Sequence, residues 1–556
     1  MSKYLVTIVR DGTEKNIYVT KGESLMEALT LNGVYMSAPC GGAGLCGKCK
    51  VQMLEGATEI SSEDENVLSK KELDEGYRLS CRSFPESYCR IRLVNSDEES
   101  FDVVSEYKGN EQSADSKIKE NSYDIAIDIG TTTIAVGLVG GDSRTLLHVV
   151  TAVNRQRAYG ADVVSRIQAS IDGKREVLKE CIRKDLQSAV EKLLDEKHIE
   201  LSKINKIVIA ANTTMGHLLM GFPCDTLGVA PFTPVDIGTI HTSFSELFCV
   251  DDDVDKNIDK DINTDINKDI NKDINTVINM GIDVEIILLP GISTYVGADI
   301  TSGLMACDFD KSDAVIAFVD LGTNGEMAIG NKDRILVTST AAGPAFEGGN
   351  ISCGMGSVAG AVCHVDIRNG ETICDTIGNA PMIGICGTGV IECTYELLKE
   401  GLIDETGMLD GAYFEQGFEL GKTPEGQPLV YTQSDIREIQ LAKSAVRAGF
   451  ETLIKRYGVS YNQIDKVYLA GGFGYKMDIE KAVGIGLFPA ELKDCIIPVG
   501  NSSLKGAVRY LAEADSVDRT GYIVEHAEEI SLAMDDDFNQ LYMDYMYFEE
   551  VSKPSK

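Results

Sequence analysis

The sequence predicts a multidomain protein of mixed α+β and α/β class, in which a small domain precedes two α/β lobes of similar plan. Three observations predict this organisation: a glycine-rich cysteine loop at 38–51, an acidic stretch at 94–122, and a strand–turn–strand pattern found at both 124–151 and 314–340. A chain of 556 residues is long enough for three or four domains. We divide it into a cysteine-bearing domain, a linker, a first lobe and a second lobe, at residues 1–93, 94–122, 123–286 and 287–556.

Composition and charge restrict the classes of function. The formal net charge is −35, which argues against nucleic acid or an anionic membrane surface as a partner. No apolar run approaches the ~18 residues of a membrane span, and the N-terminus lacks the apolar core of a signal peptide. We therefore expect a cytoplasmic protein. The 15 cysteines are an odd number, and most of them are expected to be small buried hydrophobic residues.

The N-terminal domain reads as alternating short strands and helices. Residues 3–20 form two strands around a turn, and residues 23–29 form a short helix. After the cysteine loop come a strand at 49–54, a helical stretch near 61–74 and a closing strand at 88–94. This pattern predicts one compact domain that ends near residue 93.

Four cysteines in this domain have the spacing of a metal-cluster loop. Cys40, Cys46 and Cys49 follow a C-x5-C-x2-C pattern, and Cys81 lies further along the chain. Four thiolates can hold two sulfide-bridged irons, and the surrounding glycines let the backbone wrap closely around them. Zinc is the main alternative, although a zinc ribbon normally uses two matched C-x2-C pairs. Cys89 lies on an apparent strand and is expected in the core.

The loop resembles the [2Fe–2S] loop of ferredoxin-like domains fused to reductases, with a first gap one residue longer than in plant-type ferredoxins. The strand–helix pattern fits the β-grasp fold of those domains. The resemblance therefore implies a [2Fe–2S] cluster held by Cys40, Cys46, Cys49 and Cys81.

Two polar segments separate or interrupt the domains. Residues 94–122 hold 8 acidic and 3 basic residues and few large apolar ones, which is typical of a linker. Residues 257–279 are a four-residue repeat rich in Asp, Asn and Ile, within an insertion at 251–279. Because Asp and Asn are poor helix formers, we predict a solvated surface insertion that can be removed without loss of chemistry.

The remainder of the chain repeats its own architecture. Asp128 and Gly130 in the first copy correspond to Asp320 and Gly322 in the second. Each copy continues with a long amphipathic helix, at 181–198 and 437–457, and then a buried strand that ends in small residues. Two similar halves predict a duplicated α/β fold with a cleft between the lobes.

The turn in each copy has the composition of a phosphate-binding loop. A strand-end aspartate is followed by a glycine that lets the backbone approach an anion, and then by N–H and hydroxyl donors. The two facing aspartates, Asp128 and Asp320, are expected to hold hydrated Mg²⁺ and to orient an attacking water. The donor residues are Gly130, Thr131, Thr132 and Thr133 in the first turn, and Gly322, Thr323, Asn324 and Gly325 in the second.

Together with the stretch "LAGGFG" at 469–474, this set resembles the actin, sugar-kinase and Hsp70 ATPase superfamily with its RNase H-like lobes. The resemblance implies ATP binding, with Gly471, Gly472 and Gly474 under the adenosine. Gly387 opens a further glycine turn expected near the nucleotide, or is a close packing contact. Ser502 or Ser503 is expected either near the nucleotide or as a helix N-cap.

A [2Fe–2S] domain, an acidic linker and a two-lobed ATPase in this order resemble the reductive activators of corrinoid-dependent methyltransferases. The resemblance extends to the stretches at 289–300 and 341–355. It implies ATP-dependent return of a corrinoid protein from inactive Co(II) to Co(I), with a low-potential donor such as ferredoxin or flavodoxin. The linker is expected to let the cluster domain swing between donor and acceptor. A homodimer is one option for the oligomeric state.

Two alternative functions stay open from the sequence. One is an ATP-dependent redox activator of another enzyme, such as a radical-type dehydratase, and the other is a small-molecule kinase with a regulatory cluster. A scaffold of the Hsp70 or actin kind needs no cluster-spaced cysteines, and a flavin reductase is disfavoured because no G-x-G-x-x-G follows a predicted strand. His217 lies among apolar residues and is expected as a hydrogen-bonded core residue rather than a cobalt ligand.

Overall fold

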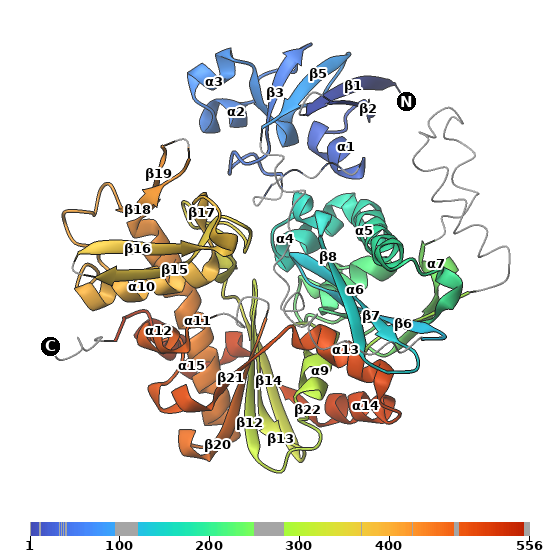
Figure 1. Cartoon of the computed structure of the whole chain (residues 1–556), viewed down its shortest axis with the longest axis vertical. Helices are drawn as coiled ribbons and strands as arrows, with labels where there is room; N and C mark the ends of the chain where they lie inside the picture. Colours follow the sequence, from blue (N-terminus) through green and yellow to red (C-terminus); the bar gives the residue numbers. More distant parts are fainter. Residues whose placement is uncertain are drawn as a thin grey trace.

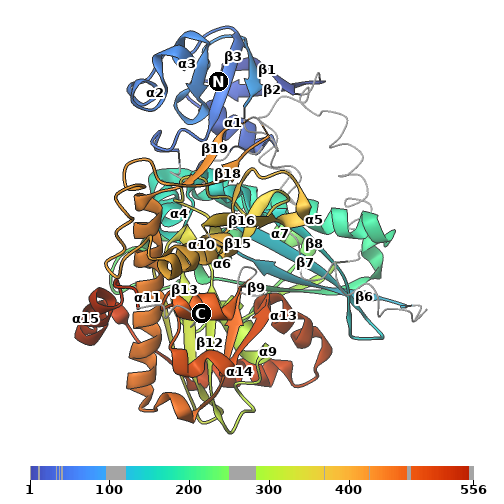
Figure 2. The same cartoon turned by 60° about the vertical axis from the view of Figure 1, so that its left-hand side comes forward.

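The computed structural model describes residues 2–10, 13–32, 34, 36, 38, 42–94, 120–248, 283–368, 370–424, 426–471 and 477–549. Cys40, Gly472, Gly474, nearly all of the predicted linker and the repeat at 257–279 lie outside these residues. The small N-terminal domain lies at one end of the molecule, beside the two larger lobes (Figure 1, Figure 2). Among the described residues, no helix is long and apolar enough to cross a membrane.

The N-terminal domain is a mixed five-stranded sheet with short helices, as the β-grasp prediction requires. The strand order is β2-β1-β5-β3-β4, and β1 pairs with β5 in parallel although every other pairing described in this sheet is antiparallel. Cys89 is buried in the core of this sheet, as predicted, and burial raises the pKa of its thiol to about 11. The elements are β1 (Lys3–Arg10), β2 (Thr13–Thr20), α1 (Leu25–Leu31), β3 (Lys50–Glu55), α2 (Ser62–Val67), α3 (Lys70–Asp74), β4 (Tyr77–Leu79), η1 (Ser80–Arg82) and β5 (Cys89–Leu93).

The first lobe is a six-stranded sheet of order β10-β11-β9-β6-β7-β8. The hairpin β6–β7–β8 is antiparallel, whereas β9 joins β6 in parallel after the long helix α5. The strands are β6 (Tyr123–Ile129), β7 (Thr133–Gly140), β8 (Leu146–Val153), β9 (Ile204–Ala211), β10 (Ile240–Ser243) and β11 (Glu285–Leu288). The helices are η4 (Arg155–Tyr159), α4 (Val163–Ala169), η5 (Ser170–Lys174), α5 (Arg175–Lys197), η6 (Leu201–Lys203), α6 (Thr213–Met220), η7 (Asp225–Leu227) and α7 (Phe244–Phe248).

The second lobe repeats this plan in a sheet of order β21-β20-β12-β13-β14-β22. Its antiparallel hairpin and parallel β20 match those of the first lobe, so the predicted duplication is confirmed. The strands of this sheet are β12 (Val315–Leu321), β13 (Gly325–Asn331), β14 (Arg334–Thr340), β20 (Ile464–Ala470), β21 (Ile496–Gly500) and β22 (Ala527–Glu529). Its helices are α11 (Gln433–Tyr457), α12 (Ile479–Gly484), η13 (Ala490–Cys495), α13 (Ser502–Ala512), α14 (Ser516–His526), η14 (Leu532–Met534) and α15 (Asp536–Asp544).

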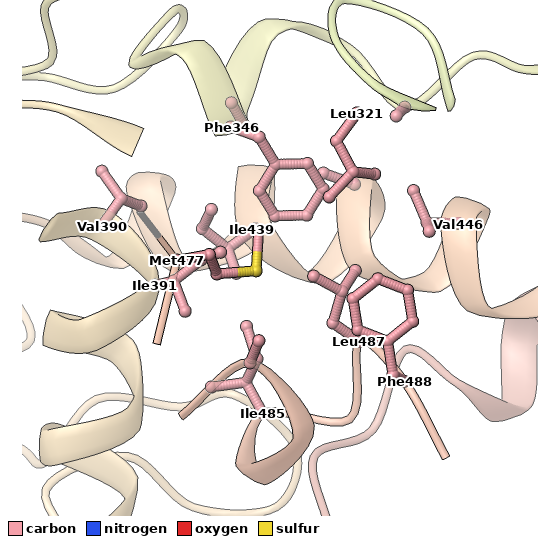
Figure 3. Packing of buried hydrophobic residues seen from close by; sticks show 14 of the residues in the cluster. Leu321, Phe346, Val390, Ile391, Ile439, Val446, Met477, Ile485, Leu487 and Phe488 are labelled. Carbon is pink, nitrogen blue, oxygen red and sulfur yellow. The ribbon is translucent and has the colours of Figure 1, made fainter. Parts of the chain in front are cut away.

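Further elements of the second lobe form a layer beside α11. They are η9 (Pro344–Glu347), β15 (Ala361–Arg368), β16 (Glu371–Thr376), η10 (Ile377–Asn379), β17 (Gly384–Ile385), α10 (Gly387–Glu400), β18 (Phe418–Lys422) and β19 (Pro428–Tyr431). The short helix η11 (Tyr461–Gln463) follows α11 and contacts η13 instead. A single hydrophobic core joins this layer to the sheet, and Figure 3 shows Phe346 beside Leu321 within it. Because Leu321 follows Asp320 and Phe346 precedes Glu347, this core fixes the backbone of two acidic residues of the site described below.

A separate apolar core joins the two lobes. It contains Ala126 and Val208 from the first sheet, Phe318 from the second, and residues of α13 and of α9 (Ala298–Ala306). The hydroxyl of Ser302 on α9 donates to the carbonyl of Ser503 on α13 (2.7 Å). Because these two helices touch both sheets, they set the relative position of the two phosphate turns.

Candidate functional site

The cysteine loop brings two of the predicted cluster ligands together. The Sγ atoms of Cys49 and Cys81 lie 3.3 Å apart, and both residues are buried, 1% and 5% exposed. Cys46 lies on the same loop and is partly exposed, as expected of a loop at the surface. Among the described residues, no three cysteine, histidine or carboxylate side chains converge as a complete metal site. The described part of the loop thus supplies a close pair of thiols.

The backbone of this loop depends on its glycines. Gly44 and Gly47 have φ values of +77° and +68°, a left-handed conformation that side chains rarely adopt. A Cβ atom at either residue would lie 2.8 Å from a side-chain carbon, of Glu63 at Gly44 and of Val67 at Gly47. The guanidinium of Arg82, beside Cys81, donates to the carbonyl of Ala43 (2.9 Å). The close thiol pair and this tight turn fit an iron–sulfur cluster, which requires thiolates and close backbone approach.

A shallow hollow of about 330 Å³ lies beside Cys46. Lys48 and Lys50 line it, together with Val67 and Leu68. Next to Cys46, Leu45 is 73% exposed. Lys50 is paired with Glu72 (2.5 Å), so the surface around the exposed end of the loop combines an apolar side chain with charges of both signs.

The two predicted phosphate turns face each other across the lobes. Asp128 near the end of β6 and Asp320 near the end of β12 occupy equivalent places, and burial, Asp299 and then Asp128 raise the pKa of Asp320. The turns differ in length by one residue: Asp128 lies opposite Ala135, whereas Asp320 lies opposite Glu326. The shorter second turn therefore places the carboxylate of Glu326 opposite its aspartate, where the first turn has the methyl group of Ala135.

Asp128 is held by two side chains from the second lobe. The Asn501 amide donates to one carboxylate oxygen (2.8 Å), and the Ser503 hydroxyl donates to the other (2.7 Å). Asn501 is also the N-cap of α13, so the expectation that Ser502 or Ser503 caps this helix is wrong. An asparagine side chain can cap with its oxygen and still donate through its amide, which leaves the serine hydroxyl available for Asp128.

Three further carboxylates that the sequence did not single out as site residues join this group: Asp299, Glu326 and Glu347. All three are largely buried but keep some exposed surface, so a ligand in solution can reach the group. Asp299 belongs to the stretch 289–300 and has no motif of its own, so its only sequence signal is that stretch's resemblance to the activators. Glu347 comes from the stretch 341–355 and accepts hydrogen bonds from threonines of both phosphate turns.

Burial, and in three cases a neighbouring carboxylate, raises the pKa values of this acidic group. Burial raises the pKa of Asp320 to about 8, and the neighbouring Asp299 and Asp128 contribute to this rise. Burial and Asp128 raise the pKa of Asp299 to about 7. Burial also raises the pKa of Asp128, Glu326 and Glu347. A divalent cation bound among these groups would favour their ionised forms.

The glycine predicted under the adenosine touches the acidic group directly. Gly471 has φ +95°, and a Cβ atom there would lie 2.4 Å from the Leu321 carbonyl and 3.1 Å from an Asp320 carboxylate oxygen. Gly387 is the first residue of α10 and is buried. Among the other predicted donors, the Gly130 and Gly322 amides donate within their own turns, to the Thr133 and Asn324 carbonyls (3.0 Å each). Thr131 and Thr132 are partly exposed, and the Thr131 hydroxyl accepts from the Asn212 amide (3.1 Å).

These residues fit a magnesium–nucleotide complex. Mg²⁺ usually binds through one or two carboxylates and completes its shell with water and phosphate oxygens, so it needs no closed protein cage. Asp128 and Asp320 would supply the carboxylates, and the threonines of the two turns would supply hydroxyl donors for phosphate. His217, in contrast, is buried and bonded through both ring nitrogens, to the Thr213 carbonyl and the Val235 amide, as the core interpretation predicts.

Comparison with known proteins covers each part of the chain. Three family models match: a 2Fe-2S iron-sulfur cluster binding domain at 8–86, the RACo middle region at 123–251, and the C-terminal ASKHA domain of RACo at 314–554. Over 85 residues, the chain is also similar to a component of the Na(+)-translocating NADH-quinone reductase of Haemophilus ducreyi (40% identity, 15% of this chain and 21% of that one).

Relatives that match most of the chain are also found. The corrinoid activation enzyme RamQ of Eubacterium limosum is 30% identical over 505 residues, 87% of this chain and 77% of the relative. The [Co(II) methylated amine-specific corrinoid protein] reductase of Methanosarcina barkeri is 26% identical over 448 residues, 76% of each chain. A solved reductive activator for a corrinoid, iron–sulfur protein covers 98% of both chains, with 26% identity and a TM-score of 0.66.

The fold and the two sites define an iron–sulfur protein fused to an ATPase of the actin, sugar-kinase and Hsp70 class. Within that class, the chain belongs to the RACo family of reductive activators of corrinoid proteins. The resemblance stated from the sequence is thereby confirmed.

Proposed function

We propose that this chain is an ATP-dependent reductive activator that returns the cobalt of a corrinoid protein from Co(II) to Co(I). One observation carries the proposal: a thiol pair in a ferredoxin-type domain and two facing phosphate turns occur in one chain, and the two domains are in contact. ATP hydrolysis is useful for such a reaction because each 100 mV of uphill electron transfer costs about 2.3 kcal/mol.

The residues divide between the two sites. Cys40, Cys46, Cys49 and Cys81 hold a [2Fe–2S] cluster, which supplies one-electron chemistry when bound. Asp128 and Asp320 bind Mg²⁺, the threonines of the two turns bind phosphate, and Gly471, Gly472 and Gly474 lie under the adenosine. The hydrogen bonds from Asn501 and Ser503 fix the orientation of the Asp128 carboxylate.

The electron donor is a low-potential carrier such as ferredoxin or flavodoxin. Support comes from the surface beside Cys46, where Lys48 and Lys50 line a hollow next to the exposed Leu45. Because Lys50 is paired with Glu72, Lys48 is the lysine of this hollow that we expect to attract an acidic carrier and raise its association rate. Lys48→Glu should raise the KM for the donor, and more so at low salt, while leaving ATP hydrolysis unchanged.

The test is reduction of Co(II) to Co(I), followed by absorbance, on anaerobically purified protein. The assay contains a corrinoid protein from the same source and a chemical reductant, with Mg-ATP present or absent. We expect Co(I) only with ATP, and its loss in Cys46→Ser. Cys495→Ser is the matched control, because Cys495 is a partly exposed cysteine far from the loop in sequence and fold.

Each outcome has a distinct meaning. Loss of Co(I) formation in Cys46→Ser but not in Cys495→Ser supports the proposal. If ATP is hydrolysed while cobalt stays oxidised with every corrinoid partner offered, the corrinoid assignment is wrong. The activator of a radical-type dehydratase is then the next function to test. The cytoplasmic location and a homodimeric state stay predictions from the sequence.

A further inference from the structure

One carboxylate joins the phosphate turns of the two lobes. The same oxygen of Glu347, Oε2, accepts a hydrogen bond from the Thr132 hydroxyl (3.3 Å) and from the Thr323 hydroxyl (3.0 Å). Thr132 belongs to the turn of the first lobe and Thr323 to the turn of the second. A single side chain thus bridges the two halves of the predicted phosphate site.

The backbone that carries Glu347 is rigidly placed. Phe346 is fully buried in the core beside Leu321 (Figure 3), so the turn cannot move far without opening that core. The next residue, Gly348, has φ +79°, and a Cβ atom there would lie 2.2 Å from the Met355 carbonyl. The other oxygen of Glu347, Oε1, would lie 3.8 Å from a Cβ atom at Gly322. The carboxylate therefore lies directly over the second phosphate turn.

Glu347 and a phosphate compete for the same donors. Both are anions that accept hydrogen bonds from hydroxyl groups, and the two threonine hydroxyls converge on one carboxylate oxygen. We infer that Glu347 is a clasp that joins Thr132 and Thr323 when no ATP is bound, and that the terminal phosphate of ATP displaces it. This inference rests on the proposed ATP site. It makes Glu347 a positioning residue that distinguishes ATP from ADP, which lacks the terminal phosphate.

The test compares the affinities of the full-length protein for Mg-ATP and Mg-ADP by calorimetry. In Glu347→Gln the neutral amide oxygen still accepts from both hydroxyls, but more weakly, and it no longer repels phosphate. We expect ATP to bind about tenfold more tightly and ADP to change by less than about twofold. The matched control is Glu326→Gln, which removes the same charge from the acidic group without removing a bond to either threonine. It should leave the ratio of the ATP and ADP affinities within about twofold of wild type.

A second readout follows the clasp without nucleotide. Spin labels on the two lobes report their separation, whose distribution should broaden in Glu347→Ala and narrow again when ATP is added. An unchanged ATP-to-ADP ratio in Glu347→Gln, or the same shift in Glu326→Gln, would overturn the clasp. If the wild-type protein binds neither nucleotide, the proposed function fails instead.

An independent set of contacts joins the first phosphate turn to the cluster domain. The buried Asn154 donates from its side chain to the Gly130 carbonyl (3.0 Å) and from its backbone to the Thr132 carbonyl (2.9 Å). Asn154 is also the N-cap of the 3-10 helix η4, and the buried Arg166 donates to the Thr131 carbonyl (2.5 Å). The carbonyls of the phosphate turn are therefore tied to η4 and α4.

The far end of η4 lies against the cluster domain. Tyr159, its last residue, is 5% exposed, and its buried hydroxyl has no hydrogen-bond partner among the residues that the structure describes. Glu23 and Glu27 of the cluster domain both contribute to raising the pKa of this phenol, after burial. Lys174, which follows in η5, forms an ion pair with Glu27 on α1. The contact is polar and local, as expected of two domains that separate and rejoin.

We also infer that η4 links occupancy of the phosphate site to docking of the cluster domain on the first lobe. Its test places one fluorophore on each domain of the cluster-loaded protein and measures energy transfer with and without Mg-ATP. Lys174→Glu should lower the transfer in the nucleotide-free state, because it places two carboxylates together. Lys179→Glu is the matched control: Lys179 pairs with Glu176 within the first lobe, so transfer should equal that of wild type.

The same measurement can overturn this inference. It fails if Mg-ATP leaves the energy transfer of the wild-type protein unchanged while calorimetry shows that ATP is bound. It also fails if Lys174→Glu and Lys179→Glu behave alike. Absence of ATP binding would count against the proposed function rather than against the link.

Discussion

Gly471→Ala tests whether the backbone around Asp320 is packed as tightly as the structure indicates. The substitution has two costs. A side chain at φ +95° costs roughly 1–2 kcal/mol, and a methyl group 2.4 Å from the Leu321 carbonyl adds about 1–3 kcal/mol for overpacking. The clash is with backbone, so no side-chain rotation relieves it. We expect a loss of about 2–5 kcal/mol in the free energy of unfolding of the second lobe, measured by urea denaturation.

The matched control is Gly458→Ala at the C-terminus of α11. Gly458 has φ +88°, and a Cβ atom there meets nothing within 4 Å in the described part of the chain, so this variant has the strain without the clash. Its expected cost is roughly 1–2 kcal/mol, with ATP affinity unchanged. In Gly471→Ala the new methyl lies 3.1 Å from an Asp320 oxygen, so the affinity for Mg-ATP should fall at least about tenfold. Equal destabilisation of the two variants, with equal ATP affinity, would refute the reasoning.

Three further predictions follow from the acidic group, the cysteine loop and the insertion. Asp320 and Asp299 have pKa values of about 8 and 7 in the fold, against 3.8 for the free group. Their contribution to the stability of the metal-free protein is therefore complete below pH 3.8 and is lost as the pH rises to about 8. The urea concentration at the midpoint of unfolding, measured in EDTA, should therefore decrease as the pH is raised from about 6 to about 8.5. Added Mg²⁺ should restore more stability at the higher pH than at the lower, and a larger effect at the lower pH would contradict the site. Gly44→Ala should lower the iron content and visible absorbance, whereas Gly22→Ala, with φ +88° and open space around it among the described residues, should not. Deleting residues 257–279 should leave both Tm and cobalt reduction unchanged, and a loss of either would show that the repeat has a role.

The sequence was sufficient for the parts of the site that recur or have fixed spacing. The cysteine spacing and the Asp-x-Gly turns are local patterns with a chemical reason at each position, and the duplicated hairpins follow from hydrophobic alternation. These features predicted both halves of the fold and the facing positions of Asp128 and Asp320.

The site residues that the sequence did not predict stand alone in it, outside any recognisable motif. Asp299 and Glu347 reach the acidic group only through tertiary packing, and neither has a neighbouring motif that marks it as a ligand. Glu326 has no counterpart in the first copy. The second turn is one residue shorter, so Glu326 lies opposite Asp320, whereas Ala135 lies opposite Asp128. Local capping rules favour serine and so predict Ser503 as a helix cap, but Asn501 takes that position and leaves the serine hydroxyl to bond Asp128.

The two proposed contacts explain why a cluster domain and an ATPase gain from being one chain. The Lys174–Glu27 pair is partly exposed, and such pairs contribute about 0–1 kcal/mol, so docking of the cluster domain is weak enough to reverse. A coupling free energy of about 1–3 kcal/mol between sites is then sufficient to shift the docked population severalfold. The first phosphate turn is hydrogen-bonded to η4, and Glu347 joins the second phosphate turn to the first. A phosphate that displaces Glu347 therefore acts on both lobes at once, and through Asn154 on the element that the cluster domain contacts. A separate electron carrier would have no such connection to the nucleotide.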